Sequence, residues 1–154
     1  MNAVAPTLTP RIIGEVESAH LAHLRLTLAP YGIDRERSIA LNATAAGDGV
    51  AEVDALVRRL VGGLKITPEQ AHEAVAALVA DGLLASEGED RVRATEAGQT
   101  LVAEVGAVAA GVIAGAYGGV PEADLAVAAR VLTEITDRLN EQLVARLEQR
   151  NAAA

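Results

Sequence analysis

The feature that most constrains this chain is the stretch of residues 66–83, which specifies both ends of one helix. Thr67 and Gln70 have the three-residue spacing of a capping box, in which each side chain bonds the backbone amide of the other residue. The proline after Thr67 takes the first helical position, where no N–H is needed. Gly82 stands where a left-handed helix end is expected. The pattern predicts a helix over residues 68–81 with a tight turn at each end.

A second constraint is the short charged segment that follows this helix. Residues 83–86 and 91–94 are each long enough for a short strand, and a Glu-Gly-Glu-Asp turn separates them. They predict a small two-stranded hairpin with Arg91 and Arg93 on one of its faces. Thr95 can then cap a long helix.

The rest of the chain favours helices. Apolar residues at helical spacing, together with helix-ending glycines and prolines, predict further helices over about residues 10–28, 35–46, 50–64, 95–117 and 121–150. The sequence has no Phe or Trp and only two Tyr, so small aliphatic side chains must fill the core. We therefore predict a mainly α fold with at most a minor sheet.

Several functional classes are not supported by the sequence. Without cysteine the chain has no disulfide, thiolate nucleophile or Cys-ligated metal site. The Gly-Asp-Gly turn at residues 47–49 has no Lys-Ser or Lys-Thr behind it and is not a phosphate loop. No serine or carboxylate motif indicates an enzyme, and no cofactor is expected. Residues 1–9 lack signal-peptide features, and residues 106–121 are too short for a membrane span, so a cytoplasmic protein is expected.

Two other features each allow two interpretations. His20 and His23 have a spacing compatible with a shared metal ion, but no third ligand accompanies them. We prefer to place His20 near a dimer interface and His23 in solvent, with no metal. The glycines within residues 106–115 can leave room for a ligand or permit close approach of helices, and we favour close approach.

Three local sequences resemble those of the MarR family of bacterial transcriptional regulators. They are Leu28-Ala29-Pro30-Tyr31-Gly32-Ile33, Ala80-Asp81-Gly82-Leu83-Leu84 and Arg93-Ala94-Thr95-Glu96-Ala97-Gly98. With the order of helices around a small wing, the resemblance covers residues 10–147. It implies a winged helix-turn-helix and an obligate homodimer built from the first, fifth and sixth helices. The two recognition helices would then enter successive major grooves of operator DNA. It also implies an effector, since many relatives release DNA on binding a small, often aromatic, anion.

The expected recognition helix, residues 68–81, is atypical for this family. The resemblance directs the following positions toward the groove: Glu69, Gln70, His72, Glu73, Ala76 and Ala77. The family usually places hydroxyl and arginine side chains there, whereas this helix has carboxylates and no Lys or Arg. Residues 34–94 contain seven Lys or Arg and eleven Asp or Glu, a net charge of -4, although phosphate neutralisation normally supplies much of the affinity for DNA. The wing is also shortened.

Two hypotheses follow. The first is a MarR-type regulator that binds operator DNA as a homodimer and is released by a small-molecule effector. Its expected DNA-binding residues are Arg58, Arg59, Lys65, Gln70, His72, Arg91 and Arg93. The second is a degenerate winged-helix dimer that has lost DNA binding and instead binds a protein partner or a small molecule. A local basic surface that offsets the acidic helix would favour the first.

Both hypotheses share one domain organisation. Residues 1–9 form a flexible arm, residues 10–30 and 95–150 a helical dimerisation region, and residues 33–94 the winged helix-turn-helix, all within a single compact domain.

Overall fold

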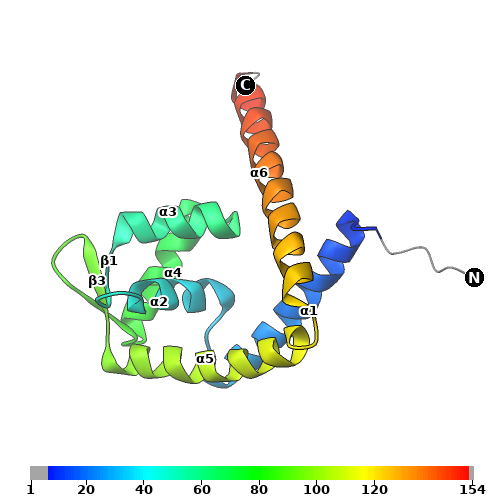
Figure 1. The fold of residues 1–154 in the computed structure, drawn as a ribbon. Coiled ribbons are helices and arrows are strands. Elements are labelled where there is room, and N and C mark those ends of the chain that lie inside the picture. The colour runs from blue at the N-terminus through cyan, green and yellow to red at the C-terminus, as the bar shows by residue number, and fades with distance from the viewer. Residues whose placement is uncertain (1–6, 153–154) are drawn as a thin grey trace, which may run out of the picture. The chain divides into compact units, whose positions relative to one another are not determined.

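The computed structural model describes residues 7–152, so residues 1–6 of the expected arm lie outside the described part. In chain order its elements are α1 (Pro10–Leu28), the 3-10 turn η1 (Ala29–Tyr31), α2 (Arg35–Ala45), β1 (Val50–Glu52), α3 (Val53–Leu64), α4 (Pro68–Ala80), β2 (Leu84–Ser86), β3 (Arg91–Ala94), α5 (Glu96–Tyr117) and α6 (Glu122–Ala152) (Figure 1). They confirm the predicted mainly α fold.

The chain divides into two compact units, and the boundary between them falls inside α5. The first unit ends at Val112 and the second begins at Ile113. The sequence was interpreted as a single compact domain, without a division within a helix. The assignment of residues 10–30 and 95–150 to a dimerisation region stays a prediction.

The small sheet has three strands, one more than the predicted hairpin. β3 lies in the middle and is antiparallel to both β1 and β2. Val50 is paired with Arg93 and Glu52 with Arg91. The prediction that residues 50–52 begin the third helix was wrong, because pairing with a strand much later in the chain satisfies the backbone of this segment instead.

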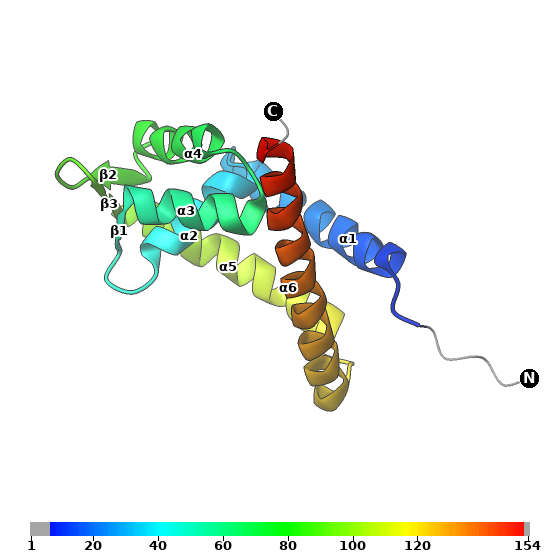
Figure 2. The same cartoon turned by 90° about the horizontal axis from the view of Figure 1, so that it is seen from above.

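The core of the first unit lies where α2, α3, α4 and the sheet meet, and Figure 2 shows α3 beside α4 with the strands at their ends. Its largest fully buried aliphatic side chains are Leu41, Leu60, Leu78 and Leu84, each from a different element. Thr44 is buried to the same degree, and its hydroxyl donates to the Ala40 carbonyl oxygen at 3.0 Å. The described core is therefore aliphatic, as the composition requires.

Both predicted ends of α4 are confirmed. The Gln70 amide donates to the Thr67 hydroxyl at 3.3 Å, and the Thr67 amide donates to Gln70 Oε1 at 2.9 Å. At the other end Gly82 has a φ of +72°, and the Leu83 amide donates to the Leu78 carbonyl oxygen at 2.9 Å. This is the six-residue bond of a Schellman motif, which ends the helix and turns the chain toward β2.

The start of α5 lies directly against the backbone that follows α4. The Thr95 hydroxyl donates to the Gly82 carbonyl oxygen at 2.8 Å and accepts from the Gly98 amide at 3.0 Å, so Thr95 caps α5 as predicted. A Cβ atom on Gly98 would lie 2.2 Å from the Leu83 carbonyl oxygen. Only glycine therefore permits this approach of α5 to the sheet.

Within the described residues, α5 is the one helix that is long and apolar enough to cross a membrane, judged by length and composition alone. Core helices of soluble proteins pass the same test. Its N-terminal half packs into the core of the first unit through Gly98, Leu101 and Val105, which are buried. Only 11% of the apolar window of α5 is buried, so most of its apolar surface is uncovered in the single chain.

Helix α6 differs from the helices of the first unit. It has 31 residues, none of which is buried. Its exposed large apolar side chains include a set at helical spacing on one face: Leu132, Leu139, Leu143 and Leu147. This apolar stripe is uncovered in the single chain.

Candidate nucleic-acid interface

The exposed side of α4 forms what we call the reading face: Glu69, Gln70, His72, Glu73 and Ala76. Ala77, expected with them, is half-buried. The opposite side of the helix packs into the core, which fixes the orientation of this face. Hydrogen bonds from its own backbone amide and from the Thr67 side chain, with a smaller effect of His72, hold the pKa of Glu69 below its usual range. The reading face is consequently negative at neutral pH.

Gln70, expected to contact bases, already uses its carbonyl oxygen in the capping box with Thr67. A glutamine that reads adenine in two-point fashion needs both its oxygen and its amide nitrogen. In this conformation Gln70 therefore offers only the amide nitrogen, and two-point readout requires that the capping box open. His72 is exposed, without such a constraint from the cap.

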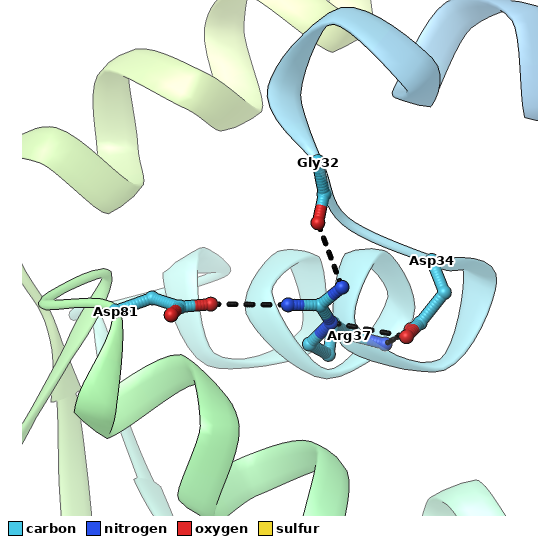
Figure 3. Close-up of polar contacts among 4 residues, drawn as sticks. All are labelled: Gly32, Asp34, Arg37 and Asp81. Atoms are coloured by element: carbon cyan, nitrogen blue, oxygen red, sulfur yellow. Dashed lines mark hydrogen bonds and ion pairs between the residues drawn. The ribbon is translucent and has the colours of Figure 1, made fainter.

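Asp81, at the end of the expected recognition helix, does not belong to the reading face. It is the C-cap of α4, and its Oδ2 accepts from Arg37 Nη1 at 3.0 Å (Figure 3). Arg37 also donates to Asp34 Oδ2 at 3.0 Å and to the Gly32 carbonyl oxygen at 2.8 Å. Its side chain is only 20% exposed. Arg37 thus joins the link between α1 and α2 to the end of α4 and offsets the charge of Asp81.

Both arginines of the wing lie on one face, as predicted, and they share one carboxylate. Arg93 Nη2 lies 2.5 Å from Glu87 Oε1, and Arg91 Nη2 lies 3.4 Å from Glu87 Oε2. The hydrogen bond from Arg93, followed by the charges of both arginines, holds the pKa of Glu87 below its usual range. Two expected DNA-binding cations are therefore engaged within the wing.

The remaining expected cations lie on or just after α3. Arg58 and Arg59 are exposed. Lys65 follows the helix in a left-handed conformation with a φ of +57°, and its Nζ donates to the Gly62 carbonyl oxygen at 2.7 Å. Gly62 and Gly63 lie within α3, which continues to Leu64.

Sequence reasoning placed Arg91 and Arg93 on one face of the wing but predicted none of the ion pairs that Arg37 and Glu87 form. Asp34 and Arg37 are three residues apart at a helix start, so that pair was readable from spacing. The partners Asp81 and Glu87 had no such signal, because their contacts depend on how the helix end and the hairpin fold.

A cavity of about 830 Å³ opens between the link from α1 to α2 and the first turns of α5. Its polar side chains are those of Tyr31, Arg37, Asp81, Glu96, Thr100 and Glu104, and the rest of its wall is formed by Gly32 and aliphatic residues. Since Arg37 is paired with carboxylates, Glu96 and Glu104 leave the cavity negative. Partial burial, together with the neighbouring Glu104, raises the pKa of the Tyr31 phenol.

The histidine pair of α1 has no third ligand beside it. Over the described residues, no group of three or more His, Cys, Asp or Glu side chains is arranged to hold a metal ion. A ring nitrogen of His20, Nδ1, lies 2.8 Å from the Val16 carbonyl oxygen of the preceding turn.

Comparison with known proteins identifies the fold. No family model matches the chain, and no curated protein matches its sequence. Among solved structures, a putative MarR-family regulator from Listeria monocytogenes complexed with a 26mer DNA aligns at a TM-score of 0.71 and 20% identity, covering 89% of this chain and 92% of that one. A MarR-family regulator from Rhodococcus sp. RHA1 aligns at 0.67 and 18% identity, covering 80% and 90%. The regulator BpsR from Bordetella bronchiseptica, whose DNA binding is regulated by 6-hydroxynicotinic acid, aligns at 0.67 and 19% identity, covering 86% and 99%. The chain therefore has the MarR-type winged helix-turn-helix fold.

Proposed function

We propose that this protein is a soluble, cytoplasmic, MarR-type transcriptional regulator that binds DNA as a homodimer and is not an enzyme. The observation that carries the proposal is the arrangement of α4 and the wing in one folded unit. The core holds one side of α4 in place and leaves the reading face exposed, while the hairpin follows directly after the Schellman turn at Gly82. This is how a winged helix-turn-helix presents a helix to the major groove and a hairpin to the adjacent backbone.

The charge distribution predicts that DNA binding is modest. Phosphate contacts must come mainly from Arg58, Arg59 and Lys65, since the wing arginines are paired with Glu87. Glu69 and Glu73 repel phosphates but can accept from the amino group of cytosine in the major groove. The same acidic face favours the alternative, a winged-helix dimer that binds a protein or small molecule and no longer reads DNA.

A polarisation titration at low salt with the DNA upstream of the gene tests the proposal. We expect a complex at micromolar protein or below, and none at that concentration would contradict DNA binding. Arg58→Ala and Arg59→Ala should each weaken binding to all DNA sequences, because each removes one phosphate contact. Each should also make the slope of log K against log salt concentration shallower by about 1. The control is Arg150→Ala, which removes an exposed arginine near the end of α6 and should leave the affinity and the salt dependence unchanged.

The homodimer is supported by the apolar side chains that each unit leaves exposed. In the first unit α1 exposes Val16 and Leu26, and in the second α6 exposes Leu139 and Leu143, which are 59% and 42% exposed. Long apolar faces of this kind are typical of surfaces that a partner covers, and a second copy provides a self-complementary one.

Sedimentation tests the assembly directly. The intact protein should sediment at twice the 15.8 kDa chain mass, and a single species of chain mass would contradict the dimer. Leu139→Glu should shift the equilibrium toward monomer by at least tenfold, because it places a charge in an apolar interface. Gln142→Glu adds the same charge to an exposed polar position of the same helix and should have little effect.

We further propose that the cavity beside Tyr31 binds the effector. Glu96 and Glu104 make it better suited to a positively charged or neutral ligand than to an anion. Benzylamine and benzoate have similar shape and opposite charge, so they form a suitable probe pair. Benzylamine should raise the melting temperature more than benzoate does, and Glu104→Gln should reduce that difference. A larger effect of benzoate would contradict the assignment of charge.

A further inference from the structure

The hairpin turn of the wing is organised around Glu87. Its backbone amide donates to the Arg91 carbonyl oxygen at 2.8 Å, which closes the turn, and its two carboxylate oxygens face Arg91 and Arg93. The Glu87 side chain is 37% exposed, whereas the two arginines are 48% and 49% exposed. The carboxylate thus contacts two arginines whose side chains remain about half exposed to solvent.

Two further glutamates lie close to the wing arginines. Glu52 of β1 is the register partner of Arg91, so a second carboxylate lies on the strand beside it. Glu89 stands in the same turn as Glu87 but has no ion pair or hydrogen bond to either arginine. Glu87 is therefore distinguished from the other glutamate of the turn by direct contact, while both carry the same charge.

We propose that the Glu87 carboxylate occupies the position of a DNA phosphate on Arg91 and Arg93, and so acts as an internal competitor that limits DNA binding by the wing. The inference rests on the proposed DNA-binding function. A carboxylate and a phosphate accept the same guanidinium N–H groups, and one N–H cannot serve both fully. Each arginine meets Glu87 through its Nη2 group, so its charge and these N–H groups become fully available to a phosphate when it leaves Glu87. Every phosphate that an arginine then neutralises releases a counterion from the DNA.

The inference predicts more than a change of net charge. Removal of any acidic side chain near DNA raises affinity by reducing repulsion, and Glu89→Gln measures this general effect. Glu87→Gln should in addition free two arginines for phosphates. The slope of log K against log salt concentration should therefore be steeper in Glu87→Gln than in Glu89→Gln by about 1 to 2, one for each arginine that binds a phosphate.

The experiment is a fluorescence polarisation titration of the full-length protein on a mixed-sequence duplex at several salt concentrations. Phosphate contacts are independent of sequence, so the operator need not be known. At the lowest salt Glu87→Gln should bind about threefold to tenfold more tightly than Glu89→Gln. Adding Arg93→Ala should remove most of this increase, whereas Arg93→Ala alone should change wild-type binding little, because there Arg93 is engaged by Glu87.

Each outcome bears on the inference. Equal affinities and slopes for the two variants, or weaker binding by Glu87→Gln, would overturn it while leaving the proposed function intact. Absence of DNA binding by the wild type and both variants would overturn the proposed function as well. Wild-type binding that Glu87→Gln tightens and Glu89→Gln leaves nearly unchanged would be the strongest support. If thermal melting shows that Glu87→Gln is unfolded, Glu87→Asp serves instead, since a side chain one methylene shorter cannot reach both arginines and should steepen the slope by about 1.

Discussion

Helices α4 and α6 are both amphipathic, yet they are stabilised in different ways. The 13-residue α4 has a side-chain cap at its start, a Schellman motif at its end, and four buried residues: Ala71, Ala74, Val75 and Leu78. The 31-residue α6 buries none and has an ion pair between Arg138 and Glu134 one turn apart. Tertiary packing supplies most of the stability of helices in proteins. Helix α4 obtains that packing within its own chain, whereas no residue of α6 is buried by the chain to which it belongs.

The largest expected change in stability comes from truncating a leucine to alanine in each of the two helices. Leu78→Ala deletes a fully buried leucine and should cost about 3 kcal/mol, lowering the melting temperature by roughly 10 °C. Leu139→Ala deletes a leucine that is 59% exposed and should cost less than about 1 kcal/mol in dilute monomer. Under the proposed homodimer, the destabilisation by Leu139→Ala should grow with protein concentration. Equal losses at all concentrations, measured by denaturant unfolding, would contradict the contrast.

Glycine-to-alanine substitutions near the two ends of α5 should have opposite effects on stability in the two units. Gly98→Ala places a Cβ 2.2 Å from the Leu83 carbonyl oxygen and should cost about 1 to 3 kcal/mol, because the backbone must move. A Cβ on Gly115, in the second unit, would point into open space, so Gly115→Ala should stabilise the helix by about 0.5 to 1 kcal/mol. Thermal melts of dilute protein would measure both. Stabilisation by Gly98→Ala would show that α5 does not approach the sheet so closely.

The smallest expected effects come from the ion pairs. Arg37 is 20% exposed, contacts two carboxylates and a carbonyl, and joins distant segments, so Arg37→Ala should cost about 1 to 2 kcal/mol. Arg138 is 71% exposed and pairs within one helix turn, so Arg138→Ala should cost about 0.3 to 0.5 kcal/mol. A double-mutant cycle of Arg37 with Asp81 would isolate the interaction free energy between these two side chains. Equal costs for the two arginines would contradict the difference between the units.

Much of the fold was predictable because its signals are local. The capping box of Thr67 and Gln70 involves residues of one helical turn, and the bonds at Gly82 span six residues. Strand β1 was missed for the opposite reason. Val50 to Glu52 are compatible with a helix start, and only their pairing with β3 makes them a strand.

The candidate site was less predictable than the fold. The resemblance to the MarR family assigned charged residues to the reading face, and Glu69 and Glu73 are exposed there. Alternation along the hairpin placed Arg91 and Arg93 on one face of the wing. What each charge does depends on its neighbours in space. Asp81 is offset by Arg37, and Arg91 and Arg93 are held by Glu87. The DNA-binding roles of the basic residues stay predictions.

The sequence by itself determined where most helices of this protein begin and end, since caps, prolines and glycine turns act over a few residues. The start of α3 is the exception, because residues 50–52 pair as a strand. It also determined that the core is aliphatic and that α6 carries an apolar face. Only the tertiary structure decided the third strand, the approach of Gly98 to Leu83, and the partners of Arg37 and Glu87. The physical reason is that these contacts join segments whose proximity arises from packing, which no local spacing specifies.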